Sequence, residues 1–200
     1  DRRQRQMCIR DRNMTYKEVR RLDAGSWYSD EYKGEKVPGL REVLELAQGK
    51  IKLNIELKPA DNGEELARKT VALIEKYNME NDCVITSFSS SALSAAKSCD
   101  ENIRVGYILS AAYGDYYDMK NIDFFSVNAA FLSKRTIDAI HNSGKQVYAW
   151  TVNNKDSIKN LTNKGVDGVI TDNPVLARET IYSRDTSETI VNMIRYVFNQ

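Results

Sequence analysis

The chain has 200 residues, of which 42% are hydrophobic, and its formal net charge at pH 7 is +1. That length is enough to bury one sizeable core, so we expect a single globular domain. No apolar run approaches the ~20 residues of a membrane-spanning helix, and the chain does not begin with a signal-peptide pattern.

Residues 1–12, "DRRQRQMCIRDR", are interpreted as a non-native leader. They are basic, lack periodicity and resemble translated sequencing-adaptor sequence, so they are left out of the expected fold. They hold five of the 29 basic and two of the 28 acidic residues, so the rest of the chain has a formal charge of −2. No nucleic-acid surface is therefore expected. The alternative is a basic arm that binds nucleic acid or an anionic membrane.

Two cysteines remain outside this leader, Cys83 and Cys99. Their spacing does not match a metal site, and two are too few for a disulfide scaffold. We expect reduced core residues, which leave the cellular compartment open.

The first predicted elements are two helices with a loop between them. "TYKE" (15–18) is a capping box, in which Thr15 caps the helix and Glu18 bonds back to it. "LREVLELA" (40–47) predicts the second helix, with Pro38 near its start and Gly49 after its end. The intervening residues 23–39 are rich in aromatic and turn residues and predict an ordered loop. Its Trp27 and Tyr28 either pack over the rim of the fold or form a substrate-side lid.

From residue 51 onward strands alternate with helices. Strand-like runs begin near residues 51, 82, 103, 123, 145 and 166. This alternation predicts parallel strands joined by crossover helices. An open doubly wound sheet usually carries a glycine-rich phosphate loop after its first strand, and the sequence contains none. The short, even period instead favours an α/β fold of the TIM (β/α)8 type, here incomplete, with about six of eight βα units.

Barrel active sites lie at the carboxyl ends of the strands, so the last inward-facing residues are the candidates. By this reasoning they are Glu56 with Lys58, Ser87, Asn128, Trp150 and Asp172. In "IKLNIELKP" (51–59), Glu56 and Lys58 are two residues apart and point to the same side of the strand. The carboxylate suits a hard cation and the ammonium suits a phosphate. The alternative is a structural ion pair inside the barrel.

Three further polar residues are expected to have structural roles. Ser87 is not in a nucleophile elbow, and we expect a helix-capping or substrate-contact hydroxyl. Asp172 is expected to cap the last helix. His141 lies near the carboxyl end of a helix, where a surface histidine is favoured by the helix dipole, so it is not expected to be catalytic.

Several of these segments together resemble the glycerophosphodiester phosphodiesterase family. They are "MTYKEVRRLDAGSWYS", "KGEKVPGLREVLELAQGKIKLNIELKP", "VITSFS", "QVYAWTVNN" and "GVDGVITDNP", and the resemblance extends from residue 13 to about 182. It implies a (β/α)8 barrel that hydrolyses a small-molecule glycerophosphodiester to an alcohol and glycerol 3-phosphate, with a bound Ca²⁺ or Mg²⁺. Such an enzyme would act in lipid metabolism, as a cytoplasmic or membrane-associated bacterial protein.

Three residues match functional positions of that family. Glu56 matches a metal-binding glutamate, Lys58 a lysine that contacts the substrate phosphate, and Trp150 an aromatic residue that packs on the substrate. The family's His-Arg-Gly strand, Glu-x-Asp strand and His-Asp pair are not found in this chain. Its two acid–base histidines therefore have no counterpart. The resemblance thus implies an N-terminally truncated barrel that lacks its first two strands, has no catalytic residues of its own and is inactive as given.

Two other functions remain open from the sequence. One is a non-catalytic phosphate-binding remnant that retains Glu56 and Lys58. The other is a barrel lyase that forms a Schiff base at Lys58. A neighbouring carboxylate argues against the lyase because it keeps the amine protonated.

The expected domain organisation has three parts. Residues 1–12 are the leader, residues 13–184 the partial barrel, and residues 185–200 an amphipathic C-terminal helix. The apolar stripe of this helix consists of Ile190, Val191, Ile194, Val197 and Phe198. It packs on its own domain or contacts a membrane or a neighbouring domain, because the family resemblance allows a membrane domain in the full-length parent.

Overall fold

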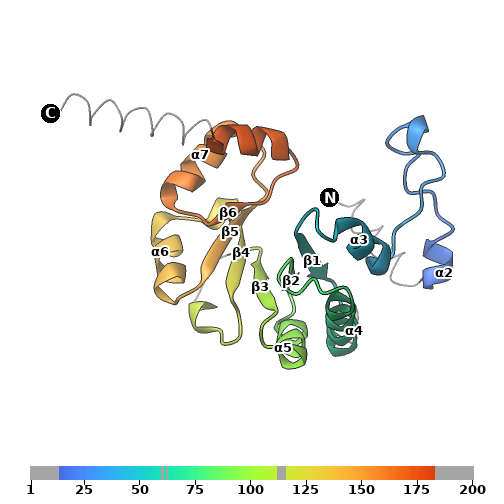
Figure 1. Ribbon diagram of the computed structural model, residues 1–200. Coiled ribbons are helices and arrows are strands. Elements are labelled where there is room, and N and C mark those ends of the chain that lie inside the picture. The colour runs from blue at the N-terminus through green and yellow to red at the C-terminus, as the bar shows by residue number, and fades with distance from the viewer. Residues whose placement is uncertain (1–13, 60, 62, 112–115, 183–200) are drawn as a thin grey trace.

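The computed structural model describes residues 14–59, 61, 63–111 and 116–182. The predicted leader (1–12) and the predicted C-terminal helix (185–200) lie outside these residues. The described part is built on one sheet of six parallel strands in sequence order (Figure 1). The strands are β1 (Leu53–Leu57), β2 (Cys83–Ser87), β3 (Arg104–Leu109), β4 (Phe124–Asn128), β5 (Gln146–Trp150) and β6 (Gly168–Val169). The sheet is curled into a half-barrel, which confirms the predicted incomplete TIM-type fold.

The connections between strands are mostly helical. The α-helices are α2 (Tyr16–Val19), α3 (Leu40–Ala47), α4 (Gly63–Lys76), α5 (Ser90–Cys99), α6 (Lys134–Asn142) and α7 (Lys155–Lys164). Short 3-10 turns are η1 (Asp30–Tyr32), η2 (Tyr116–Asp118) and η3 (Ala129–Phe131), and residues 174–182 form a final helical segment. In Figure 1 the helices α4, α5 and α6 lie along one side of the curled sheet. No helix among the described residues is long and apolar enough to cross a membrane.

The hydrophobic core lies between the sheet and these helices. Along each strand, alternate residues face the helices. Leu57, Ile85, Val105 and Val147 are fully or almost fully buried on this face. They belong to the same core cluster as the apolar side chains of α4 to α7, among them Val71, Ile74, Leu93, Ile137 and Ile158. Burial of this apolar surface is the main force that holds the helices against the sheet.

The opposite, concave face carries a mixed layer of polar and aromatic residues near the amino ends of the strands. The ring of Phe124 lies over Gly106, its register partner on β3, and stacks against Tyr148 with centroids 4.8 Å apart. Arg104 lies over the same ring at 5.7 Å and donates to the Gln146 side chain. The inner layer at the amino ends of the strands therefore consists of Arg104, Phe124, Gln146 and Tyr148.

The predicted capping box of Thr15 and Glu18 is present. Ser133 and Asn154 cap α6 and α7. One prediction is wrong. Asp172 does not cap the final helix, because Asn173 Oδ1 accepts the hydrogen bond from the Leu176 backbone N–H. The cap therefore lies one residue later, which places Pro174 at the first helical position, where its missing N–H costs nothing.

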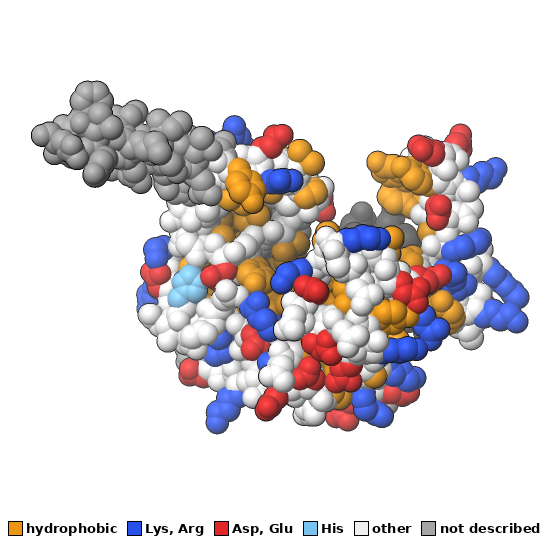
Figure 2. All heavy atoms as spheres, viewed as in Figure 1, with side chains coloured by type: hydrophobic (Ala, Val, Ile, Leu, Met, Phe, Trp, Pro, Cys, Tyr) orange, Lys and Arg blue, Asp and Glu red, His pale blue; other side chains and the backbone are white. Residues whose placement is uncertain are grey.

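The loop at residues 23–39 is ordered, as predicted. The Asp23 carboxylate accepts hydrogen bonds from the backbone N–H groups of Gly25, Ser26 and Gly34 and from the Ser26 hydroxyl. The loop forms the blue protrusion in Figure 1, and hydrophobic side chains gather near its tip in Figure 2. In this loop Trp27 is 82% exposed and contacts the Tyr28 ring edge-on. In this part of the chain, the aromatic side chains therefore do not pack over the rim.

Candidate functional site

Glu56 and Lys58 lie at the carboxyl end of β1, on the concave face. Leu53 and Leu57 occupy the core-facing positions of this strand, so the polar side chains between them point into the half-barrel. Lys58 Nζ is 3.3 Å from Glu56 Oε2, and 62% of the lysine side chain is exposed. Exposed ion pairs contribute about 0–1 kcal/mol. The carboxylate therefore holds the ammonium only weakly.

Trp150 is the last residue of β5. It lies across from Glu56 and Lys58 at the opening of the half-barrel formed by the carboxyl ends of the strands (the mouth). Its indole N–H donates to the Ser126 carbonyl oxygen at 2.9 Å, which fixes the orientation of the ring. The register of β4 and β5 places Trp150 beside Asn128, whose side-chain oxygen accepts from the Ala130 N–H and begins η3. Asn128 is therefore engaged locally, whereas Trp150 presents part of its ring to the mouth.

The structure corrects the expectation for Ser87. Ser87 pairs with Leu57 in the register and faces the core, where it is completely buried. Its hydroxyl donates to the Leu57 carbonyl oxygen at 2.8 Å and accepts from the Ser89 N–H at 3.0 Å. The α5 cap is Ser89. Ser87 therefore neither caps the helix nor faces a substrate, and its role is to bind the ends of β1 and β2 together.

Phe88, which the sequence analysis did not single out, occupies the inward position at the end of β2. It is 49% exposed, and its ring meets the Trp150 ring at 90° with centroids 6.4 Å apart. The signal that could have identified it is the parity of the strand: if Ser87 faces the core, its neighbour faces the barrel interior. Each face of "VITSF" carries both apolar and hydroxyl side chains, so the sequence alone did not fix that parity.

Asp172 lies at the same end of the sheet, beyond β6. Its carboxylate accepts a hydrogen bond from Asn153 Nδ2 at 2.7 Å, and its backbone N–H donates to Asn153 Oδ1 at 2.9 Å. The Thr171 hydroxyl bonds to the same amide oxygen. These bonds join the segments that follow β5 and β6. They give Asp172 a structural role that does not require a ligand.

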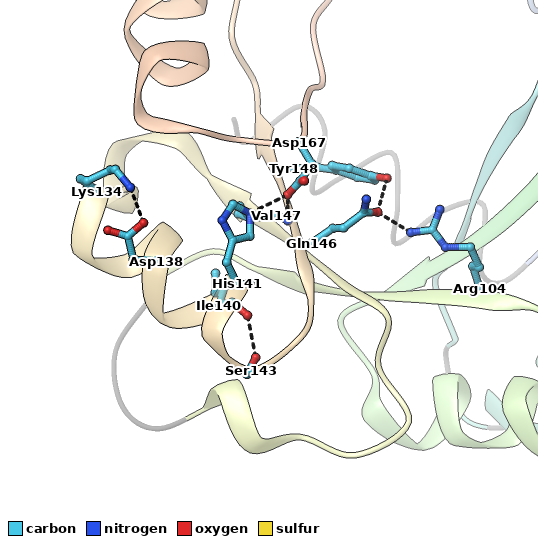
Figure 3. A network of polar contacts seen from close by, with 10 residues as sticks. All are labelled: Arg104, Lys134, Asp138, Ile140, His141, Ser143, Gln146, Val147, Tyr148 and Asp167. Atoms are coloured by element: carbon cyan, nitrogen blue, oxygen red, sulfur yellow. Dashed lines mark hydrogen bonds and ion pairs between the residues drawn. The ribbon is translucent and has the colours of Figure 1, made fainter.

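His141 is the single histidine of the chain, and Figure 3 shows its surroundings. Its Nε2 is 2.9 Å from Asp167 Oδ2, and the same carboxylate oxygen accepts the backbone N–H of Val147 at 2.7 Å. Val147 is the second residue of β5, so this contact marks the amino end of the strands. As expected, His141 is therefore an outer residue and is remote from Glu56, Lys58 and Trp150.

The residues at the mouth do not by themselves fit a divalent cation. Ca²⁺ and Mg²⁺ take six or more oxygen ligands, most often with several carboxylates. Glu56 supplies one carboxylate, and the nearby Asn54 Oδ1 already accepts from the Thr86 hydroxyl at 2.9 Å. In the described ranges, no group of three or more His, Cys, Asp or Glu side chains is placed to hold a metal ion.

Comparison with known sequences identifies relatives over most of the chain. The profile of the glycerophosphoryl diester phosphodiesterase family matches residues 3–176. A glycerophosphodiester phosphodiesterase of Caldanaerobacter subterraneus is 27% identical over 194 residues, which cover 92% of this chain and 72% of the relative. A putative glycerophosphodiester phosphodiesterase of Bacillus subtilis is 28% identical over 169 residues, which cover 82% of this chain and 70% of the relative.

Solved structures show the same fold. A phosphodiesterase of Oleispira antarctica, in complex with the product sn-glycerol 3-phosphate, aligns with a TM-score of 0.73 and 28% identity, and the match covers 85% of this chain and 71% of that protein. A glycerophosphodiester phosphodiesterase of Parabacteroides distasonis aligns with a TM-score of 0.76 at 21% identity, covering 86% of this chain and 73% of that protein. The second likeness concerns the fold alone.

Proposed function

The chain belongs to the glycerophosphoryl diester phosphodiesterase family, whose members are phosphoric diester hydrolases, and from this premise we propose that its mouth binds the phosphate of a glycerophosphodiester at Lys58. In this proposal Trp150 packs on the substrate. In the complete parent enzyme Glu56 would be one ligand of a divalent cation, Ca²⁺ or Mg²⁺, and the reaction would be hydrolysis to an alcohol and glycerol 3-phosphate. The observation that carries the proposal is the exposed Glu56–Lys58 pair at the carboxyl end of β1.

Two chemical features support binding at this position. Lys58 provides a largely exposed ammonium group, and a lysine acts as a point charge that suits phosphate. The relative from Oleispira antarctica was solved with sn-glycerol 3-phosphate, the product that hydrolysis of a glycerophosphodiester would release. A ligand of this kind carries its negative charge on the phosphate, which would replace Glu56 as the partner of the lysine.

We further propose that the 200-residue chain binds but does not turn over its substrate. General acid–base catalysis needs a group within hydrogen-bond reach of the reacting atoms. The single histidine is held by Asp167 at the far end of the sheet, and Glu56 alone is a poor cation site.

A Schiff-base lyase at Lys58 receives less support from the geometry. A nucleophilic lysine needs a desolvated environment or a neighbouring cation to release its proton. The Lys58 side chain is 62% exposed and lies against a carboxylate. Neither requirement is therefore met at Lys58.

Titration of the purified chain with inorganic phosphate and with sn-glycerol 3-phosphate, followed by ligand-observed NMR, tests the binding site. Lys58→Met should weaken both ligands about tenfold, which corresponds to about 1.4 kcal/mol. Lys52→Met is the matched control, because Lys52 lies just before the same strand, on the same side but at its other end, and pairs with Asp82. Equal affinities in the wild type and Lys58→Met would refute phosphate binding at Lys58.

A turnover assay tests the second part of the proposal. The chain is incubated with glycerophosphocholine and Ca²⁺, and release of glycerol 3-phosphate is followed enzymatically. We expect no release above the protein-free rate. Robust release that disappears in Lys58→Met would show that the chain is an active enzyme as given.

A further inference from the structure

We propose that Phe88 is a specificity-determining residue, which together with Trp150 holds the carbon-bearing group esterified to the bound phosphate. This inference rests on the proposed phosphate binding at Lys58. In addition to the phosphate at Lys58, the site would then bind a small organic group with exposed C–H surface, either the glycerol moiety or the leaving alcohol.

The position of Phe88 follows from the strand register. Leu57 pairs with Ser87, and Ser87 pairs with Tyr107 on the next strand. One residue further along, Phe88 is therefore the neighbour of Lys58 on the concave side of the sheet. A phosphate on the lysine would lie next to the aromatic ring, and the group esterified to it would extend over that ring.

The backbone that carries Phe88 is held on both sides. Ser87 bonds to the Leu57 carbonyl oxygen at 2.8 Å and to the Ser89 N–H at 3.0 Å. The Ser89 hydroxyl in turn accepts from the Ala92 N–H and caps α5. The backbone at Phe88 is consequently fixed, so this segment loses little conformational freedom when a ligand packs on the ring.

The Phe88 and Trp150 rings contact each other and leave part of their surface exposed to solvent. Phe88 and Trp150 meet edge to face at 6.4 Å, and the indole N–H is already bonded to the Ser126 carbonyl oxygen at 2.9 Å. The indole therefore loses no hydrogen bond when a carbon-bearing group covers it. Phe88 leaves 49% of its surface exposed. Covering an exposed aromatic ring with C–H groups is favourable by the hydrophobic effect, and a cationic alcohol gains a further attraction from the ring faces.

The test compares ligands that share a phosphate and differ in the organic group. Binding of inorganic phosphate, sn-glycerol 3-phosphate and phosphocholine to the 200-residue chain is measured by ligand-observed NMR up to millimolar concentrations. We expect at least one ester to bind more tightly than inorganic phosphate. In Phe88→Ala this advantage should fall about fivefold, while the affinity for inorganic phosphate stays unchanged. The ester that loses affinity identifies which arm of the diester lies on the rings.

Further variants separate this role from a structural one. Phe88→Tyr should retain the advantage, because it keeps the ring. Leu46→Ala removes a 71%-exposed apolar side chain from α3 and should change neither ligand. Circular dichroism and thermal unfolding check that each variant is folded, which the half-exposure of Phe88 makes the expected result.

The outcomes distinguish the two proposals. If Lys58→Met weakens inorganic phosphate but Phe88→Ala leaves the ester advantage intact, the role of Phe88 is refuted and the phosphate site stands. If Lys58→Met leaves inorganic phosphate unaffected, the phosphate site is refuted, and Phe88 is refuted with it as a residue of that site. Absence of binding by all three ligands contradicts both.

Discussion

His141 Nε2 lies 2.9 Å from Asp167 Oδ2, and this contact joins the end of α6 to the start of β6 (Figure 3). The aspartate has a second partner, the Val147 N–H on β5 at 2.7 Å. Asp123 repeats the arrangement before β4, where its carboxylate accepts the Val105 N–H at 2.7 Å and pairs with Lys97 at 3.0 Å. The two aspartates thus bind the amino ends of neighbouring strands together, at the edge opposite the candidate site.

Replacement of His141 should affect stability slightly and ligand binding not at all. The pair is partly exposed, so we expect His141→Ala to lower the free energy of unfolding by less than about 1 kcal/mol. Phosphate affinity should equal that of the wild type, because the histidine is at the far end of the sheet. Urea denaturation and the NMR titration measure the two quantities. A loss of phosphate binding by folded His141→Ala would contradict this placement.

Replacement of Asp167 should cost more than replacement of its partner. Asp167→Ala leaves the part-buried Val147 N–H without this acceptor, and an unsatisfied buried donor costs about 1–3 kcal/mol. Asp138→Ala is the control: Asp138 lies on α6 and pairs with Lys134 at the surface, so its loss should change the urea midpoint little. Equal midpoints for Asp167→Ala and Asp138→Ala would show that the Val147 contact is dispensable.

Gly106 should tolerate no side chain. A Cβ at this position would lie 2.1 Å from the nearest atom of the Phe124 ring, which is fully buried. Gly106→Ala is therefore expected to destabilise the fold by about 1–3 kcal/mol through overpacking. The same substitution in a Phe124→Leu background should cost less, because the ring that it meets is gone. A double-mutant cycle by chemical denaturation measures this coupling, and strict additivity would contradict it.

Asp23 should keep the 23–39 loop ordered through mildly acidic pH. Hydrogen bonds from the Ser26 backbone and hydroxyl, and then from the Gly25 and Gly34 N–H groups, hold the pKa of its carboxyl group well below the usual value. A lowered folded-state pKa means that this stabilisation is complete above the unfolded pKa of about 3.9 and is lost as the pH falls below it. Amide hydrogen exchange in the loop should therefore show equal protection factors at pH 7 and pH 5.

The Asp23→Asn variant should loosen this loop at neutral pH. Asparagine has one acceptor oxygen in place of two, so it cannot serve Gly25, Ser26 and Gly34 together. Faster exchange should be confined to the loop, with the β-sheet unchanged. Asp30→Asn, at an exposed position of the same loop, is the control and should exchange as the wild type does.

The two described cysteines should differ in reactivity, because Cys83 is a core residue, as predicted, whereas the same prediction is wrong for Cys99, which is exposed. Cys83 is buried in the core, and its desolvation, followed by the charges of Asp82 and Glu80, raises the pKa of its thiol to about 11. Thiolate is the reactive form, so iodoacetamide at pH 8 should modify the exposed Cys99 and leave Cys83 intact until the protein is unfolded. Peptide mass mapping reads each site separately. Rapid modification of Cys83 in the native protein would show that the core opens there.

Much of the fold was determined by the sequence itself. The predicted strand starts at 51, 82, 103, 123, 145 and 166 lie one or two residues before the observed ones. This agreement reflects local physics, because caps and terminal glycines set the helix ends and apolar runs set the strands. The placement of Glu56 and Lys58 on one face also followed from sequence, since polar and apolar residues alternate strictly along β1.

Tertiary structure decided what local pattern left undetermined. Because each face of β2 carries both an apolar and a hydroxyl side chain, only its register with β1 could show that Ser87 faces the core and Phe88 the mouth. The contact between His141 and Asp167 joins residues 26 positions apart and depends on the packing of α6 against the sheet. A single strand fixes the direction of its own side chains, but the assembled sheet determines which of them meet.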